Sequence, residues 1–187
     1  ETSGRFSMPT DPAGLPSNTE AEKSLLGAIV LKPDLLGTVS EAVVPKDFSL
    51  QKHQRIYQRM LDLHERRDGI DIVILTQELD KHEQLQACDG ISYLVDLTAG
   101  MPALENVGGY VRIVLDTSRR RHIIFAAQAA TTAAMSAPES PEIIAAGFIE
   151  ELSKIETHTD DGPVHPSEFL DQFPGGINAL LSPQPGI

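Results

Sequence analysis

The sequence is poor in the residues that build metal centres, redox pairs and nucleic-acid surfaces. It contains one cysteine, Cys88, and no tryptophan. A single thiol forms no internal disulfide and no thiolate zinc site, so the chain fits a reducing compartment and we expect a cytoplasmic protein. Fifteen basic against 27 acidic side chains give a formal net charge of −12. This balance disfavours binding to nucleic-acid phosphates or to anionic membranes, because both need clustered Lys and Arg.

Long apolar runs and common catalytic motifs are also missing. No run approaches the roughly 20 residues that span a bilayer, and residues 1–15 lack the apolar core of a signal peptide. The phosphate-binding patterns G-x-x-x-x-G-K-[ST] and G-x-G-x-x-G are absent, as is H-E-x-x-H. His64, His82 and Cys88 have no companions at metal-ligand spacing. We therefore expect no membrane span, no cofactor, no metal and no catalytic residues in this chain.

The chain divides into four zones by composition. Residues 1–16 are rich in Pro and Gly and predict a flexible arm. Residues 17–102 alternate short apolar-periodic segments with Pro and Gly, which predicts a small globular helical bundle. Residues 103–156 hold two long helical segments, and residues 157–187 return to Pro, Gly and Asp around a short amphipathic stretch. The predicted fold class is all-α, with a bundle, a long antiparallel helical hairpin and a short linker helix.

The start of the first helix carries two overlapping capping boxes. Ser17 with Glu20, and Thr19 with Glu22, each have the spacing in which a hydroxyl and a carboxylate satisfy each other's backbone donors. The pattern therefore predicts a helix that begins at these residues and uses the two glutamates at its N-terminus.

Two further segments of the bundle need a choice between readings. Residues 70–75 are rich in β-branched side chains, which favours a strand, whereas Asp71 as a cap and the apolar spacing favour a helix; we choose the helix. His53 lies on one helical stripe with Ile56, Tyr57, Met60 and His64. We interpret His53 as a hydrogen-bonded core or interface histidine rather than a metal ligand.

The hairpin is predicted from spacing and from its short connection. Apolar spacing from near Asn106 continues for about 30 residues, or roughly 45 Å of helix, which exceeds the expected diameter of the bundle. Ser140 is a cap residue and Pro141 suits the first position of a second helix that runs to Glu156. A short loop between two helices makes them antiparallel, so we expect a protruding hairpin.

Arg119, Arg120 and Arg121 form the strongest basic run of the chain. The favoured interpretation is a solvated helix face that pairs with Glu150 and Glu151 of the second hairpin helix. The alternative is a contact with a partner's acidic patch or with phosphate. We favour the first because three consecutive residues of a helix point in different directions and form no single patch.

Negative charge is concentrated at the C-terminal end. Residues 137–187 contain nine acids and one base, and so carry −8 of the net −12, which suits contact with proteins rather than nucleic acid. Residues 167–173 are apolar on one face and too short for a stable isolated helix. Such a piece between Pro and Gly docks into a groove or remains a disordered tail, and the sequence leaves both readings open.

An ordered set of short motifs now points to a family. The set covers roughly residues 15–156, and its order and gaps are more specific than any single motif. The motifs are PxxxEAExxLLGA at 16–28, PxDF at 45–48, HxxIY at 53–57, IDIVxL at 70–75, GxxYL at 90–94, and NVxxY at 106–110 with Arg121 further along. This set resembles the amino-terminal domain of the DnaB family of bacterial replicative helicases.

The resemblance implies an all-helical domain whose hairpins pair into dimers. The dimers assemble into a trimer-of-dimers collar on a hexameric 5′–3′ DNA helicase of the primosome, and the collar receives the primase and the helicase loader. A linker helix joins the collar to the ATPase motor and packs on the neighbouring motor domain. ATP and magnesium belong to that motor, whose motifs are absent here, so the resemblance implies no catalysis by this chain.

The resemblance also assigns two groups of residues by their position along the motif. The candidates for hairpin self-association are Val114, Phe125, Ile144, Phe148, Leu152 and Ile155. The candidates for linker docking are Phe169, Leu170, Phe173, Leu180 and Leu181.

Two other functional classes compete with a collar domain. A stand-alone helical adaptor, or a protein like a helicase loader, would use the acidic tail itself for recognition. An enzyme with an unrecognised site is the third class, and the sequence offers no residue set for it.

Overall fold

The computed structural model describes residues 14–99, 106–136 and 140–156, and the described residues form helices and no strand. The predicted all-α class is confirmed. The α-helices are α1 (Thr19–Leu31), α2 (Leu35–Ala42), α3 (Gln51–Glu65), α4 (Ile72–Lys81), α5 (Gly90–Thr98), α6 (Val107–Ser136) and α7 (Pro141–Glu156). Two short 3₁₀ helices are η1 (Pro45–Asp47) and η2 (Gln86–Cys88). None of the described helices is long and apolar enough to cross a membrane.

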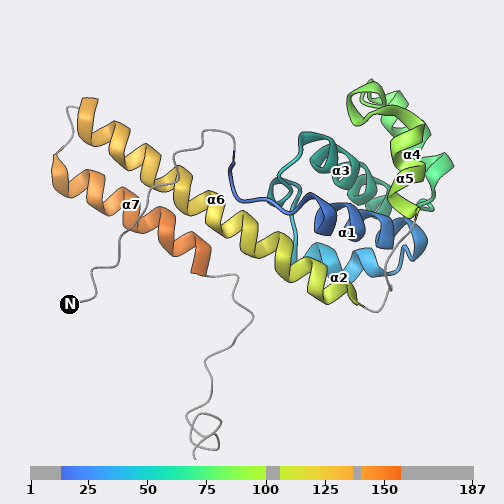
Figure 1. The fold of residues 1–187 in the computed structure, drawn as a ribbon, viewed down its shortest axis with the longest axis horizontal. Coiled ribbons are helices and arrows are strands. Elements are labelled where there is room, and N and C mark those ends of the chain that lie inside the picture. The colour runs from blue at the N-terminus through green and yellow to red at the C-terminus, as the bar shows by residue number, and fades with distance from the viewer. Residues whose placement is uncertain (1–13, 100–105, 137–139, 157–187) are drawn as a thin grey trace, which may run out of the picture.

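Helix α1 is the centre of the bundle. It packs against α3, α5 and the first part of α6 (Figure 1). Leu25, Leu26 and Ile29 of α1 are fully buried and meet Ile56 and Met60 of α3 in one continuous core. Burying each such side chain stabilises the fold by about 1.5–3 kcal/mol, so the short helices are held by packing more than by their own helix propensity.

The caps of α1 and α4 test two predictions of local structure. Asp71 accepts a hydrogen bond from the backbone N–H of Ile74 at 2.8 Å and starts α4, so the helical reading of residues 70–75 is confirmed. The prediction of capping boxes at the start of α1 is wrong. The cap is Asn18, whose Oδ1 accepts from the N–H of Ala21 at 3.0 Å. Glu22 is fully buried and takes no part in capping.

The stripe predicted on α3 is confirmed except at its end. His53, Ile56, Tyr57 and Met60 are buried, whereas His64 is exposed. Leu63 takes the last buried position of this helix.

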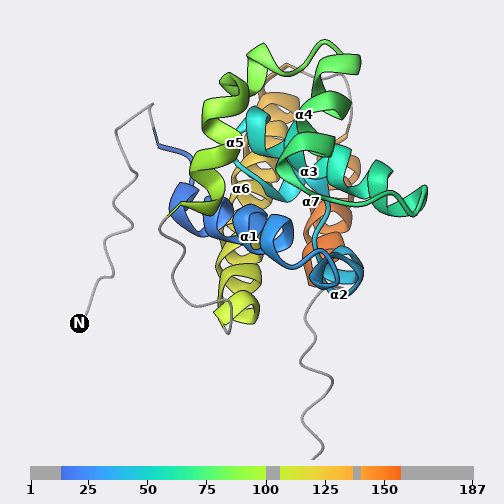
Figure 2. The same ribbon diagram turned by 90° about the vertical axis from the view of Figure 1, so that its right-hand side faces the viewer.

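Helices α6 and α7 form the predicted hairpin. Helix α6 has 30 residues, or about 45 Å. Its first part lies against the bundle, and its second part extends beyond the bundle beside the antiparallel α7 (Figure 1). Viewed end-on in Figure 2, the bundle helices lie in front of the hairpin. The connection at residues 137–139, residues 1–13 of the arm predicted over residues 1–16, and the predicted linker at 157–187 lie outside the described residues.

Candidate functional site

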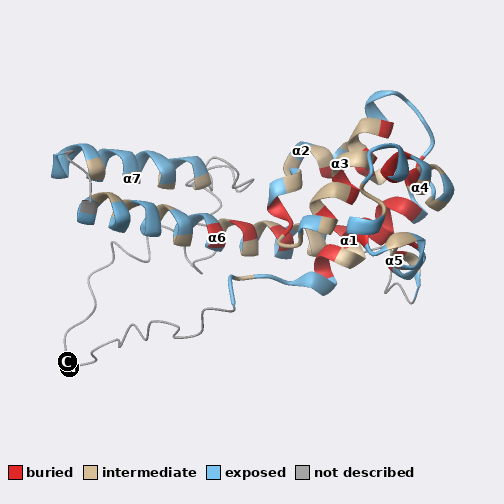
Figure 3. Cartoon of the chain, turned by 90° about the horizontal axis from the view of Figure 1, so that it is seen from above, coloured by how far each residue is buried: buried red, intermediate tan, exposed pale blue. Residues whose placement is uncertain are grey.

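The hairpin loses its packing partners along its length. Val107, Val114, Ser118 and Arg121 are buried where α6 passes the bundle. Beyond Arg121, the described side chains of α6 and α7 are exposed or half-buried (Figure 3). A pair of helices that contact only each other leaves most of its surface open for contact with another molecule. The protruding half of the hairpin is therefore the main candidate interaction surface.

A buried polar cluster fixes the base of the hairpin. Asp47 of η1 accepts from Ser118 Oγ at 2.7 Å through Oδ1 and from the N–H of Val44 at 2.8 Å through Oδ2. Arg121, only 6% exposed, donates to the backbone carbonyls of Asp47 at 2.5 Å and Pro16 at 2.8 Å. Burial lowers the pKa of the Arg121 guanidinium, against the opposing field of nearby acids. This cluster joins α6 to η1 and to the segment that precedes α1.

The arginine run is only in part the solvated, acid-paired face that the sequence favoured. Arg120 pairs with Asp116 on its own helix at 2.9 Å, and Arg121 points into the bundle. Glu150 and Glu151 pair with Lys154 on α7. The expectation that the three arginines point in different directions is confirmed, but the charge pattern gave no sign that one of them is buried.

A second buried network joins three helices of the bundle. Glu22 Oε2 of α1 lies 2.6 Å from His53 Nδ1 of α3, and His53 Nε2 lies 2.6 Å from the hydroxyl of Tyr93 in α5. Glu22 Oε1 accepts from the backbone N–H of Ser49 at 2.7 Å. Burial raises the pKa of Glu22, but the hydrogen bonds from His53 and Ser49 outweigh it, so the pKa is lowered and Glu22 stays ionised. The interpretation of His53 as a hydrogen-bonded core residue is confirmed.

The ammonium group of Lys52 packs against the face of the Tyr93 ring. Lys52 Nζ lies 3.6 Å from the centre of the Tyr93 ring and 2.8 Å from Asp89 Oδ2. Lys52 therefore combines a cation–π contact with an ion pair and covers the outer edge of the Glu22–His53–Tyr93 network. Glu22 and His53 are fully buried and Tyr93 is half-buried, and the network acts as a structural tie between α1, α3 and α5.

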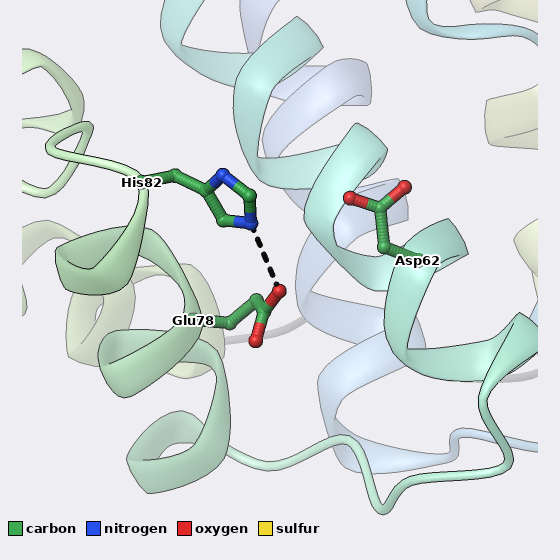
Figure 4. Close-up of side chains that lie close together, drawn as sticks. All are labelled: Asp62, Glu78 and His82. Atoms are coloured by element: carbon green, nitrogen blue, oxygen red, sulfur yellow. Dashed lines mark hydrogen bonds and ion pairs between the residues drawn. The ribbon is translucent and has the colours of Figure 1, made fainter.

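Asp62, Glu78 and His82 form the one group of possible metal ligands among the described residues, with ligand atoms within 4.8 Å of one another (Figure 4). Neighbouring side chains already occupy the Glu78 oxygens. Arg66 donates to Oε1 at 3.0 Å and to Oε2 at 2.9 Å, and His82 Nε2 lies 3.1 Å from Oε1. The hydrogen bond from Arg66 lowers the pKa of Glu78. We interpret the group as an ion-pair network that joins the end of α3 to α4.

The residues expected to mediate self-association differ in how far they are exposed to solvent. Val114 is fully buried in the bundle core and so is closed to a partner in this conformation. Phe125 is 49% exposed on α6. The other four candidates are half-buried on α7, and two of them line a cleft of about 450 Å³ between the tips of α6 and α7. The half-buried candidates are Ile144, Phe148, Leu152 and Ile155.

Sequence reasoning missed the apolar side chains that face solvent on the hairpin. They lie off the apolar stripe that the spacing singles out. Besides Phe125, the exposed large apolar residues on α6 and α7 are Ile113, Ile123, Met135, Ile143 and Ile149. Solvent exposure is the property that marks these residues as candidates. It cannot be read from the sequence without knowing which face of each helix the other hairpin helix covers. The predicted linker-docking residues lie outside the described residues.

The comparisons with known proteins agree with this architecture. Residues 14–116 match the family described as "DnaB-like helicase N terminal domain". The replicative DNA helicase DnaC of Bacillus subtilis (strain 168) is 41% identical over 109 residues, which are 58% of this chain and 24% of that protein. The chain thus spans about a quarter of the length of this relative.

Two solved structures share the fold. The N-terminal domain of DnaB helicase from Mycobacterium tuberculosis superimposes with a TM-score of 0.71 and 27% identity, over 75% of this chain and 99% of that one. A DnaB-like replicative helicase studied for its interactions with primase gives a TM-score of 0.59 and 25% identity, over 84% of this chain and 36% of that one. The family match, the bundle and the hairpin together show that this chain belongs to the DnaB-like helicase N-terminal domain family.

Proposed function

We propose that this chain is the oligomerisation and primase-docking domain of a hexameric replicative DNA helicase. The observation that carries the proposal is the protruding hairpin with apolar side chains open to solvent. Ile143 is 60% exposed and Ile149 is 63% exposed on α7. Apolar groups repeated along a projecting element favour association, because burying them removes apolar surface from water.

Self-association through the hairpin gives the domain its role. A two-fold dimer uses the same patch on both copies, so one exposed apolar residue contributes twice. We propose Phe125 of the original candidates, together with Ile143 and Ile149, as the residues at that contact. Three such dimers would form the collar of the hexamer.

The remaining partners are proposals that the family supports. One structural relative is described with its interactions with primase, and we propose primase as a partner of this domain. We also propose the helicase loader as a partner, and a neighbouring motor domain as the site that receives residues 167–181. ATP and magnesium would act in the motor, and the protein would work in the cytoplasm.

Sedimentation equilibrium of matched variants tests the self-association. Ile149→Asp places a charge on the hairpin, and Val73→Asp places one on α4 of the bundle, where Val73 is 66% exposed. We expect the Ile149→Asp variant to raise the dimer dissociation constant at least about tenfold, which is 1.4 kcal/mol, and the Val73→Asp variant to leave it unchanged. A wild-type chain that stays monomeric at high concentration, or equal effects of the two substitutions, would contradict the proposal.

Calorimetric titration with primase tests the second partner. We expect heat of binding from the wild-type chain and from the Val73→Asp control. A dissociation constant in the micromolar range corresponds to a binding free energy of about −8 kcal/mol. If primase gives no heat of binding with the wild-type chain at concentrations of tens of micromolar, primase is removed from the proposal.

A further inference from the structure

A second surface lies at the base of the hairpin, where the end of α7 returns to the bundle. It is a groove of about 280 Å³ between η1, α6 and α7. Its apolar part is formed by Val44, Leu115 and Ile155. Val44 is 44% exposed, so this apolar surface is open to solvent. The remaining lining residues are polar or charged: Lys46, Asp47, Ser118, Arg119, His122 and Lys154.

The groove is lined by more basic than acidic side chains, in a chain whose net charge is strongly negative. Three of its lining residues carry positive charge, and the one carboxylate, Asp47, is buried and hydrogen-bonded to Ser118 and Val44. Glu150 and Glu151 offset Lys154 from the same helix. Lys46 is exposed and makes no ion pair with any residue that the structure describes. An apolar floor with a cationic rim suits an acidic amphipathic peptide.

We propose that residues 167–173 of the same chain dock in this groove. The segment carries Glu168 and Asp171 for the rim, and Phe169, Leu170 and Phe173 for the floor. Residues 177–181 contain no charged side chain and match the rim less well. The whole tail after Glu156 has four acids and no Lys or Arg, so its charge is of one sign.

The position of the tether favours this occupant over a separate molecule. Ile155 lines the groove and Glu156 is the last residue of α7, so the tail starts at the groove. Residues 157–166 are ten residues long and reach at most about 33–36 Å. A short tether gives an effective concentration in the millimolar range, which lets a weak peptide contact form within one chain.

Docking in this groove would compete with the linker role proposed above. The same residues 167–173 cannot lie in their own groove and on a neighbouring motor domain at once. The groove would thus store the linker segment until a motor domain displaces it. The inference itself requires no self-association and no primase.

Paramagnetic relaxation in the full chain tests the docking. A spin label on Ser167→Cys reports on nearby amides, and the native Cys88 is buried. We expect the label to broaden the amide signals of Val44, Leu115 and His122. A label on Ser182→Cys, beyond the proposed segment, is the matched control and should broaden them several-fold less.

A charge reversal in the groove gives the second comparison. Lys46→Glu should reduce the broadening from the Ser167 label several-fold, whereas Lys32→Glu, an exposed lysine at the end of α1, should leave it unchanged. Unchanged amide spectra elsewhere would show that both variants fold.

Mixing experiments separate docking within one chain from docking between chains. Spin-labelled chains without ¹⁵N are mixed with unlabelled ¹⁵N chains, and we expect no broadening between them. Broadening between chains at the groove would overturn the proposal in favour of a second copy's tail. Broadening nowhere in the groove, or equal broadening from both label positions, would also overturn it. Sedimentation of the same samples reports separately on the dimer, so the failure of one proposal is distinguishable from failure of the other.

Discussion

Replacing Arg121 with methionine should loosen the base of the hairpin at a large cost in stability. Methionine keeps much of the apolar stem of the side chain but removes the guanidinium. The carbonyl of Asp47, which accepts from Arg121 in a buried position at 2.5 Å, loses this partner. The carbonyl of Pro16, which accepts at 2.8 Å, is only half-buried and can turn to water.

The expected magnitude follows from these two acceptors. Leaving a buried carbonyl unsatisfied costs about 1–3 kcal/mol, and a hydrogen bond that water can replace costs about 1 kcal/mol. Release of the desolvated guanidinium offsets part of the sum. The two costs sum to about 2–4 kcal/mol, and after the offset we expect the free energy of unfolding to fall by about 1–3 kcal/mol.

Urea unfolding followed by circular dichroism at 222 nm measures this loss. Arg120→Met is the matched control, because Arg120 is exposed and its i,i+4 pair with Asp116 is worth only about 0.3–0.5 kcal/mol. An Arg121→Met variant within about 0.5 kcal/mol of the Arg120→Met variant would refute the reasoning that a buried arginine holds the hairpin to the bundle.

Three further predictions concern the bundle. Glu22→Gln breaks the buried pair with His53 and should lower the free energy of unfolding by about 3 kcal/mol in urea titrations at pH 7. Because the folded pKa of Glu22 lies below its ordinary 4.5, its stabilising contribution is complete above that value and is lost as the pH falls through the lowered pKa. The difference between wild type and Glu22→Gln should therefore shrink below about pH 4.5, and a constant difference would contradict the assignment. Asp71→Ala removes the cap of α4 and should cost about 1 kcal/mol, whereas Asp68→Ala, outside the cap, should cost less in the same titration.

Local pattern was enough to predict the helices. Apolar spacing and cap residues act over three or four positions, so Asp71 and the two hairpin helices could be located from the sequence. The cap of α1 was misplaced by one residue, because Ser17, Asn18 and Thr19 are all good cap residues and only the actual backbone selects Asn18.

The buried charges could not be predicted in the same way. The sequence pattern predicts that Glu22 caps the start of a helix, yet its hydrogen-bond partner His53 lies 31 positions away. The sequence pattern places Arg121 in a run of surface arginines, yet it donates a hydrogen bond to the carbonyl of Pro16, 105 positions away. Pairing across such separations depends on how the helices pack. The same reason explains why the exposed apolar face of the hairpin was missed.

Hydrogen–deuterium exchange at two protein concentrations tests most directly whether the hairpin carries the self-association. Samples are compared below and well above the dimer dissociation constant. We predict that amides of residues 120–136 and 140–156 exchange more slowly at the higher concentration, while α3, α4 and α5 are unchanged. Protection confined to the bundle, or none in the hairpin of a sample that sediments as a dimer, would contradict the account.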